Sequence, residues 1–412
     1  MEKNRDPDFK RRDFLNLVKT FGLTSTLLGV SQLSHSGGLI SRDALAAATT
    51  DIAKKRTRKK PRFTLKFGGA GFDSRTLNIE RQGGLIFVSD IEERTDGEIK
   101  VEFIGSNQIC SQLNCVKMCQ EGLVDLYISS TQNASAIANY FNVLDFAYLW
   151  PSRAAQYYFL YHPESERLFR EPLREHHGLQ FLWSLAELRN VMLGLKYKKA
   201  SKIMTIDELK GMKIRVTGTR LGRLSMKLMG MNPVPVAWEE TKTFLKAGII
   251  DGAETFSSAV AYSDLSPAIS QDVRCQFLSG FEHTAMNLNK FRQLGAELQK
   301  ALMESAYLTQ VHVQGVNEAA LLNLIGITAP PLPGTFYHRY GIRNCIWSKS
   351  ELEKAERMSS PKYNPEPWQE WREKLNVMAG GVDVFEAFYS IGREIPPETQ
   401  AIDITPRRWW KS

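Results

Sequence analysis

The chain of 412 residues is long enough for two or three domains, since a typical domain holds about 150 residues. Its hydrophobic and charged fractions, 43% and 24%, are ordinary globular values and exclude a disordered, collagen-like or multi-span membrane protein. The net charge of +8 is partly local, because residues 54–62 carry seven Lys and Arg and no acid. We therefore predict no nucleic-acid partner, and a small anionic ligand fits the same charge balance.

The amino terminus has the features of an export signal. An arginine pair at 11–12 precedes the apolar stretch 17–33, which is too polar and interrupted for a membrane span of about 20 residues. Small residues at 44–46 form a cleavage pattern. Residues 1–46 thus resemble a twin-arginine signal peptide, with an amphipathic helix as the alternative. Its removal would leave a periplasmic protein that begins with a basic linker, 47–62.

Strand and helix patterns alternate in the first part of the body. Alternating apolar residues predict strands at 63–67 and 99–104, and an apolar run predicts a buried strand at 123–128. Helical spacing predicts helices at 77–94 and 113–122. This order of elements implies parallel strand pairing with right-handed crossovers.

A second block of the same kind begins near Phe181. We predict its strands at 188–193, 213–216, 232–236 and 249–254, the third of them at a sheet edge because it contains two prolines. Short helices are predicted after Thr205 and at 220–229 and 239–247. Long helical patterns fill 289–325, whereas 361–412 is rich in Trp and Pro and weakly periodic.

These blocks predict an α/β protein with two lobes, each a mostly parallel sheet flanked by helices, and a ligand cleft between the lobes. We expect lobe I to comprise residues 63–187 plus about 279–320. Lobe II would comprise 188–278 plus about 321–360. The remainder, 361–412, is expected to be a helical or irregular extension.

Five cysteines, an odd number, leave at least one thiol unpaired. Cys110, Cys115 and Cys119 have C-x4-C-x3-C spacing, which is the one metal-like feature of the sequence. An exported iron–sulfur, zinc or redox protein is one interpretation, although no fourth ligand lies nearby and no C-x2-C pair is present. Small buried side chains, or one disulfide, form the other interpretation. Cys275 and Cys345 stand alone.

Charged residues fall on or just after predicted strands of the second block. Arg189, Arg215 and Glu254 occupy these positions, and ligands of open α/β sheets bind at the carboxyl ends of strands. An arginine there offers a planar fork to a carboxylate, whereas either arginine taken alone could be a surface ion pair. No G-x-S-x-G, H-E-x-x-H or Walker motif is present. His176-His177 is expected in a solvated loop, and His283 on the surface.

Four segments in a fixed order carry a family resemblance. LKGMKIRV at 209–216 is followed by MNPVPV at 231–236, WEE at 238–240 and GIIDGAE at 248–254. This run resembles the solute-binding proteins of tripartite ATP-independent periplasmic (TRAP) transporters, of the dicarboxylate-binding type. The likeness extends over roughly residues 63–345.

The resemblance implies a periplasmic binding protein, monomeric or homodimeric, with no catalytic activity, cofactor or metal. It would close around a small carboxylate and deliver it to TRAP membrane permease subunits; a sensor that presents its ligand to a receptor is an alternative. In this family the arginine of the KIRV strand, Arg215 in this sequence, binds the ligand carboxylate. Glu254 matches a cation ligand of one subgroup, but we expect it to be a structural partner of an arginine or a backbone amide. The site residues that the resemblance implies are Arg215, Arg189, Trp238, Thr255, Glu254 and Phe256.

Overall fold

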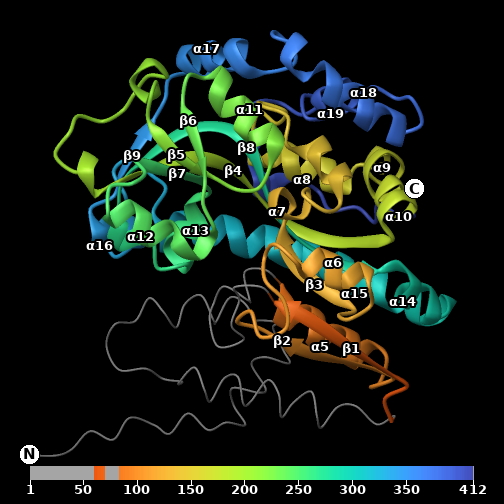
Figure 1. Cartoon of the computed structure of the whole chain (residues 1–412). Coiled ribbons are helices and arrows are strands. Elements are labelled where there is room, and N and C mark those ends of the chain that lie inside the picture. The colour runs from red at the N-terminus through yellow and green to blue at the C-terminus, as the bar shows by residue number, and fades with distance from the viewer. Residues whose placement is uncertain (1–59, 70–82, 412) are drawn as a thin grey trace, which may run out of the picture. The chain divides into compact units, whose positions relative to one another are not determined.

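The computed structural model describes residues 60–69 and 83–411 (Figure 1). The predicted signal peptide, most of the basic linker and the start of the helix predicted from residue 77 lie outside these ranges. A search of the described ranges for a helix long and apolar enough to cross a bilayer finds none.

The described strands form one sheet in the order β2-β1-β3-β8-β4-β7-β5-β6, with β9 (Arg343–Ile346) paired to β8. At one end, β1 (Phe63–Gly69) lies parallel between β2 (Ile99–Ile104) and β3 (Leu126–Ser130). The helices α5 (Gly84–Arg94) and α6 (Cys115–Gln120) connect these strands. The predicted parallel block is confirmed.

The other end of the sheet is the second parallel block. β5 (Lys213–Val216) pairs with β6 (Asn232–Pro235) and with β7 (Gly252–Thr255), and β6 is the edge strand, as predicted from its prolines. Gly252 is required where β7 meets β4, because a Cβ there would stand 2.7 Å from the Met192 carbonyl oxygen. The connecting helices are α11 (Arg220–Leu228) and α12 (Thr241–Lys246), the latter preceded by a 3-10 turn, η5 (Trp238–Glu240).

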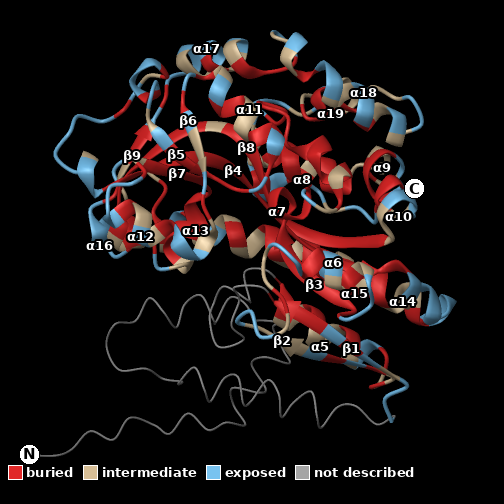
Figure 2. Cartoon of the chain, in the orientation of Figure 1, coloured by how far each residue is buried: buried red, intermediate tan, exposed pale blue. Residues whose placement is uncertain are grey.

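Two long antiparallel strands join the blocks. β4 (Leu179–Gly194) pairs with β7, and β8 (Ile269–Asn287) pairs with β3, while β4 and β8 pair with each other. Figure 2 shows both strands almost wholly buried. The sequence predicted only 188–193 of β4 and missed β8, because a strand covered on both faces has no alternation of polar and apolar residues.

The pairing of the long strands is interrupted near their middle. Arg189 pairs with Leu278 and Val191 with Val273, so residues 274–277 of β8 lie opposite Asn190 alone. The Asn190 side-chain oxygen accepts a hydrogen bond from the Gln276 backbone amide at 3.1 Å. Arg189 therefore lies on a strand, as predicted, but that strand, β4, is longer than expected and antiparallel to β7.

Helices cover both faces of the sheet and continue to the carboxyl terminus. The longest helix, α15 (Ala296–Ala320), packs on β4 and α5, and α17 (Lys349–Ser359) packs on β8 and α11. Within the last segment Trp368 and Trp409 are fully buried. The other helices of the described ranges are α7 (Thr131–Ala134), α8 (Arg153–Tyr161), α9 (Pro163–Ser165), α10 (Glu171–His177), α13 (Ser257–Tyr262), α14 (Leu288–Gln293), α16 (Phe336–Tyr340), α18 (Gln369–Met378) and α19 (Val384–Ile391).

Candidate functional site

Arg215 is a buried cation with no acidic partner among the described residues. It lies on β5 and is 2% exposed. Its Nε donates to the Val236 carbonyl oxygen at 3.0 Å and its Nη1 to that of Glu254 at 3.5 Å. The guanidinium lies 5.1 Å from the centre of the Trp238 ring. Across the described ranges, no carboxylate makes an ion pair with it.

The environment of Arg215 disfavours its charge but does not remove it. Burial lowers the pKa of the guanidinium to about 10, with Glu254 opposing and Arg189 adding to the shift. The side chain therefore remains a cation at neutral pH. An uncompensated buried charge costs several kcal/mol, whereas an anion that pairs with both nitrogens of the fork would offset that cost. The arrangement is suited to binding a carboxylate.

Arg189 and Glu254 form a buried ion pair. The Arg189 Nη1 lies 3.0 Å from Glu254 Oε1, its Nε donates to the Ser279 carbonyl oxygen at 3.0 Å, and its guanidinium lies over the Phe256 ring. The arginine partner expected for Glu254 is thus present. The second oxygen, Glu254 Oε2, is buried and has no hydrogen-bond partner within the described part of the chain.

The remaining predicted residues lie around these charges. Thr255 ends β7 opposite Asn190 and is 2% exposed. Phe256 follows it as the residue that precedes α13, and Trp238 opens η5 as a half-buried ring. Through the contacts of the two arginines, the fold gathers the predicted residues from β4, β5, β7 and η5 into one cluster.

Sequence reasoning missed four polar residues that adjoin this cluster. Thr219 Oγ1 donates to Asp145 Oδ2 at 2.8 Å, and Thr217 Oγ1 donates to Gln132 Oε1 at 2.8 Å. Both threonines follow β5, whereas Gln132 lies in α7 and Asp145 follows the 3-10 helix η1 (Asn139–Leu144). These two bonds link the predicted lobe II to the predicted lobe I.

Asp145 is an unusual carboxyl group because it is fully buried. Burial raises its pKa to about 7, while the hydrogen bond from Thr219 and the charge of Arg189 lower it and Glu254 raises it. The sequence held a signal for Gln132, because this residue lies just after the end of β3, and ligands of open α/β sheets bind at the carboxyl ends of strands. Asp145 lies between apolar residues, and no pattern in the sequence marked it as a site residue.

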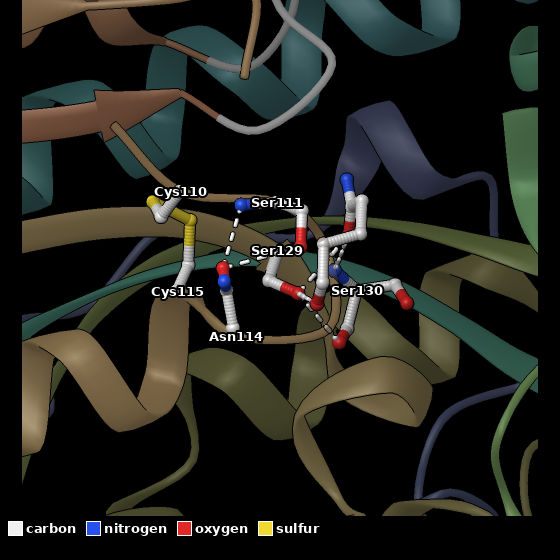
Figure 3. The surroundings of a disulfide bond; sticks show 7 residues. Cys110, Ser111, Asn114, Cys115, Ser129 and Ser130 are labelled. Carbon is white, nitrogen blue, oxygen red and sulfur yellow. Dashed lines mark hydrogen bonds between the residues drawn. A yellow bond between two sulfur atoms is a disulfide. The ribbon is translucent and has the colours of Figure 1, made fainter. Parts of the chain in front are cut away.

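The cysteine cluster contains a disulfide. Figure 3 shows the bond between Cys110 and Cys115. Cys119 is a buried free thiol. Within the described ranges, no group of three or more His, Cys, Asp or Glu side chains is placed to hold a metal ion. The disulfide closes the loop that carries Gln112, whose Oε1 accepts from Ser129 Oγ at 3.0 Å. The disulfide interpretation is confirmed, and the metal or redox interpretation has no support here.

Two predictions about histidines are wrong. His283 is buried in β8 rather than exposed: its Nε2 lies 2.8 Å from Tyr127 Oη, and its ring stacks on Phe181. Burial lowers the pKa of His283 to about 3, so the ring is neutral. His176 and His177 end helix α10 instead of lying in a loop. His283 thus contributes to core packing, and His176 and His177 form the end of a helix.

Two other charged places in the described ranges are less suited to a ligand. Arg170 is also buried, but it donates to Ser165 and to the Leu160 carbonyl oxygen and lies against the Phe181 and Trp409 rings. A cavity of about 390 Å³ lies beside α18, and the arginine that lines it, Arg372, is already paired with Asp383. Arg372 is therefore already neutralised, whereas Arg170, like Arg215, has no carboxylate partner among the described residues. Arg215 differs from Arg170 in lying on β5, within the KIRV segment, and beside the buried Arg189–Glu254 pair.

The fold and the buried arginine cluster define an α/β binding protein. The profile of the family described as "Bacterial extracellular solute-binding protein, family 7" matches residues 78–323, more than half of the chain. The chain belongs to this family, whose members bind solutes rather than catalyse reactions.

Relatives share low identity with the chain. The 2,3-diketo-L-gulonate-binding periplasmic protein YiaO of Escherichia coli is 25% identical over 57% of this chain and 70% of its own length. The uncharacterized protein YiiZ of Salmonella typhimurium is 29% identical over 40% of this chain, and the match spans about half (49%) of YiiZ.

Solved structures share the fold over most of the chain. The sugar acid binding protein DctPAm of Advenella mimigardefordensis, in complex with galactonate, has a TM-score of 0.64 and 19% identity, and covers 82% of this chain and 99% of its own. A TRAP periplasmic solute binding protein of Shewanella oneidensis with bound succinate has a TM-score of 0.63 and 16% identity, and covers 81% and 100%. At these identities the likeness concerns the fold alone.

Proposed function

We propose that this protein captures a small carboxylate in the periplasm and delivers it to TRAP membrane permease subunits. The observation that carries the proposal is Arg215, a buried guanidinium with no acidic partner within the described ranges. Family membership supports it, as do relatives whose names include solute-binding and C4-dicarboxylate-binding proteins. Export by the twin-arginine route is part of the proposal and is supported by the arginine pair at 11–12.

Binding by closure of two lobes accounts for the bonds between them. The carboxylate pairs with Arg215, Trp238 covers the guanidinium, and Arg189 with Glu254 forms the floor of the site. The bonds from Thr217 and Thr219 to Gln132 and Asp145 hold the closed form. A ligand that contacts both lobes stabilises this form through its differential affinity for the closed and open states.

Thermal denaturation with a library of organic acids, amino acids and sugar acids tests the proposal. At least one carboxylate should raise the Tm of the mature protein, and Arg215→Ala should abolish the shift while the circular dichroism spectrum stays native. Arg215→Lys should recover little of it, because an ammonium group lacks the planar fork.

Arg220→Ala is the matched control for these variants. Arg220 is exposed and lies five positions further along the same segment, so its loss should leave the thermal shift unchanged. A normal shift in Arg215→Ala would show that the site has been assigned wrongly.

A further inference from the structure

Among the described residues around Arg215, the charges leave one free cation. Arg189 and Glu254 neutralise each other across 3.0 Å, so their pair carries no net charge toward a ligand. Glu239 also acts on Arg215, but it is exposed, and solvent screens its charge. A ligand held here meets one uncompensated positive charge from the described residues. A second negative charge on that ligand would find no unpaired cation among the described residues of this cluster.

The same cluster offers hydrogen-bond acceptors without donors. Glu254 Oε2 and Asp145 Oδ1 are both buried and have no hydrogen-bond partner among the described residues. The Gln132 side chain lowers the pKa of Asp145, but its Nε2 makes no hydrogen bond of normal length to any described residue. A buried acceptor without a donor costs about 1–3 kcal/mol. Hydroxyl groups on a ligand can satisfy these oxygens, whereas a carboxylate has no proton to donate to them.

We propose that the solute is a monocarboxylate that carries hydroxyl groups, with its carboxylate on Arg215 and its hydroxyls donating to Glu254 and Asp145. This inference rests on the proposed function and narrows its substrate class. An unsubstituted dicarboxylate of the same length carries a second carboxylate, which can donate to neither acceptor and finds no unpaired cation among the described residues of the cluster. An unsubstituted monocarboxylate leaves both acceptors unsatisfied, and a site built for a hydroxyl strongly rejects the analogue that lacks it.

Acids matched in carbon number test the inference by isothermal titration calorimetry of the mature protein. The four-carbon set is threonate, succinate and butyrate, and the six-carbon set is gluconate, adipate and hexanoate. In at least one set the hydroxylated monocarboxylate should bind at least ten-fold more tightly than the other two acids.

Removing the negative charge of Glu254 should change the preference for a hydroxylated monocarboxylate over a dicarboxylate. Glu254→Gln takes away the negative charge and frees Arg189, so adipate or succinate should gain at least ten-fold relative to the hydroxylated acid of the same length. Asp145→Asn should act in the same direction while keeping an amide oxygen for Thr219, and it replaces Glu254→Gln if that variant does not fold. Arg220→Ala should leave every ratio unchanged.

Each outcome separates the substrate class from the proposed function. Tighter binding of succinate or adipate by the native protein, lost in Arg215→Ala, overturns the substrate class and leaves carboxylate binding intact. Unchanged preference in both Glu254→Gln and Asp145→Asn also overturns it. Binding of none of the six acids, or binding that persists without Arg215, overturns the proposed function itself.

Discussion

At the scale of single residues, the candidate site is a set of charges that the fold has removed from water. Arg189 and Glu254 compensate each other, whereas the described neighbours of Arg215 are carbonyl oxygens and an aromatic face. Asp145 compensates neither arginine directly and accepts one hydrogen bond from Thr219. Buried groups of this kind reduce stability unless they are paired, so their presence points to binding rather than to folding.

Asp145 should make the stability of the ligand-free protein depend on pH. Its pKa rises from 3.8 to about 7 on folding, so the folded state holds a proton that the unfolded state releases. The stabilisation is complete below pH 3.8 and is lost as the pH rises to about 7. The amide introduced by Asp145→Asn does not titrate, so the native protein should lose up to about 4 kcal/mol relative to this variant over the same range.

Urea denaturation of both proteins at pH 4.5, 6 and 7.5 measures this difference. Titration of groups other than Asp145 contributes to both proteins and largely cancels in the comparison. A difference in unfolding free energy that stays constant across the three pH values would contradict the burial argument for Asp145.

At the scale of elements, the last helices belong to the main core instead of forming a loose appendage. The Trp368 ring, just before α18, lies 5.7 Å from Phe146, and α18 packs on η1 and α19. The predicted extension 361–412 therefore stabilises the segment that also carries Asp145. This is packing that weak periodicity could not reveal.

Two substitutions on α18 separate packing from helix propensity. Leu375 is fully buried in the core, whereas Val377 is 77% exposed on the same helix. Leu375→Ala should lower the free energy of unfolding by about 2–5 kcal/mol because it leaves a cavity. Val377→Ala should change it by no more than about 0.5 kcal/mol. Equal effects in chemical denaturation would show that α18 is not part of the core.

At the scale of the whole molecule, β4 and β8 connect the two blocks, and their pairing is interrupted around Asn190 and residues 274–277. The side chains of Thr217 and Gln132 meet across the blocks at 2.8 Å. We infer that the irregular middle of the long strands is where the lobes change their relative orientation, and that the threonine bonds stabilise closure.

Thr217→Val should weaken ligand binding without unfolding the protein. It keeps the shape of the side chain but removes the donor to Gln132, a loss of about 1 kcal/mol or about five-fold in Kd for the tightest-binding acid of the matched sets. Calorimetry measures the Kd, and Thr243→Val, at an exposed position of α12, is the control. An unchanged Kd would indicate that this bond is not specific to the closed state.

The sequence by itself determined the elements whose burial has a local period. Strands β1, β2, β5 and β6 were predicted within two residues, because alternation or prolines mark them directly. The ordered motifs from 209 to 254 led to the family and to Arg215, and the spacing of the cysteines left a disulfide open.

Only the tertiary structure decided how distant residues combine. The pair Arg189–Glu254 spans 65 positions and the bond Asp145–Thr219 spans 74, and neither has a pattern within any one element. The whole of β8 was missed for the same reason, because a strand covered on both faces is defined by its pairing with β3 and β4 and not by a pattern of its own. The periodicity of a sequence indicates which side of an element is buried. The partner of a buried charge depends instead on which distant segment of the chain packs beside it.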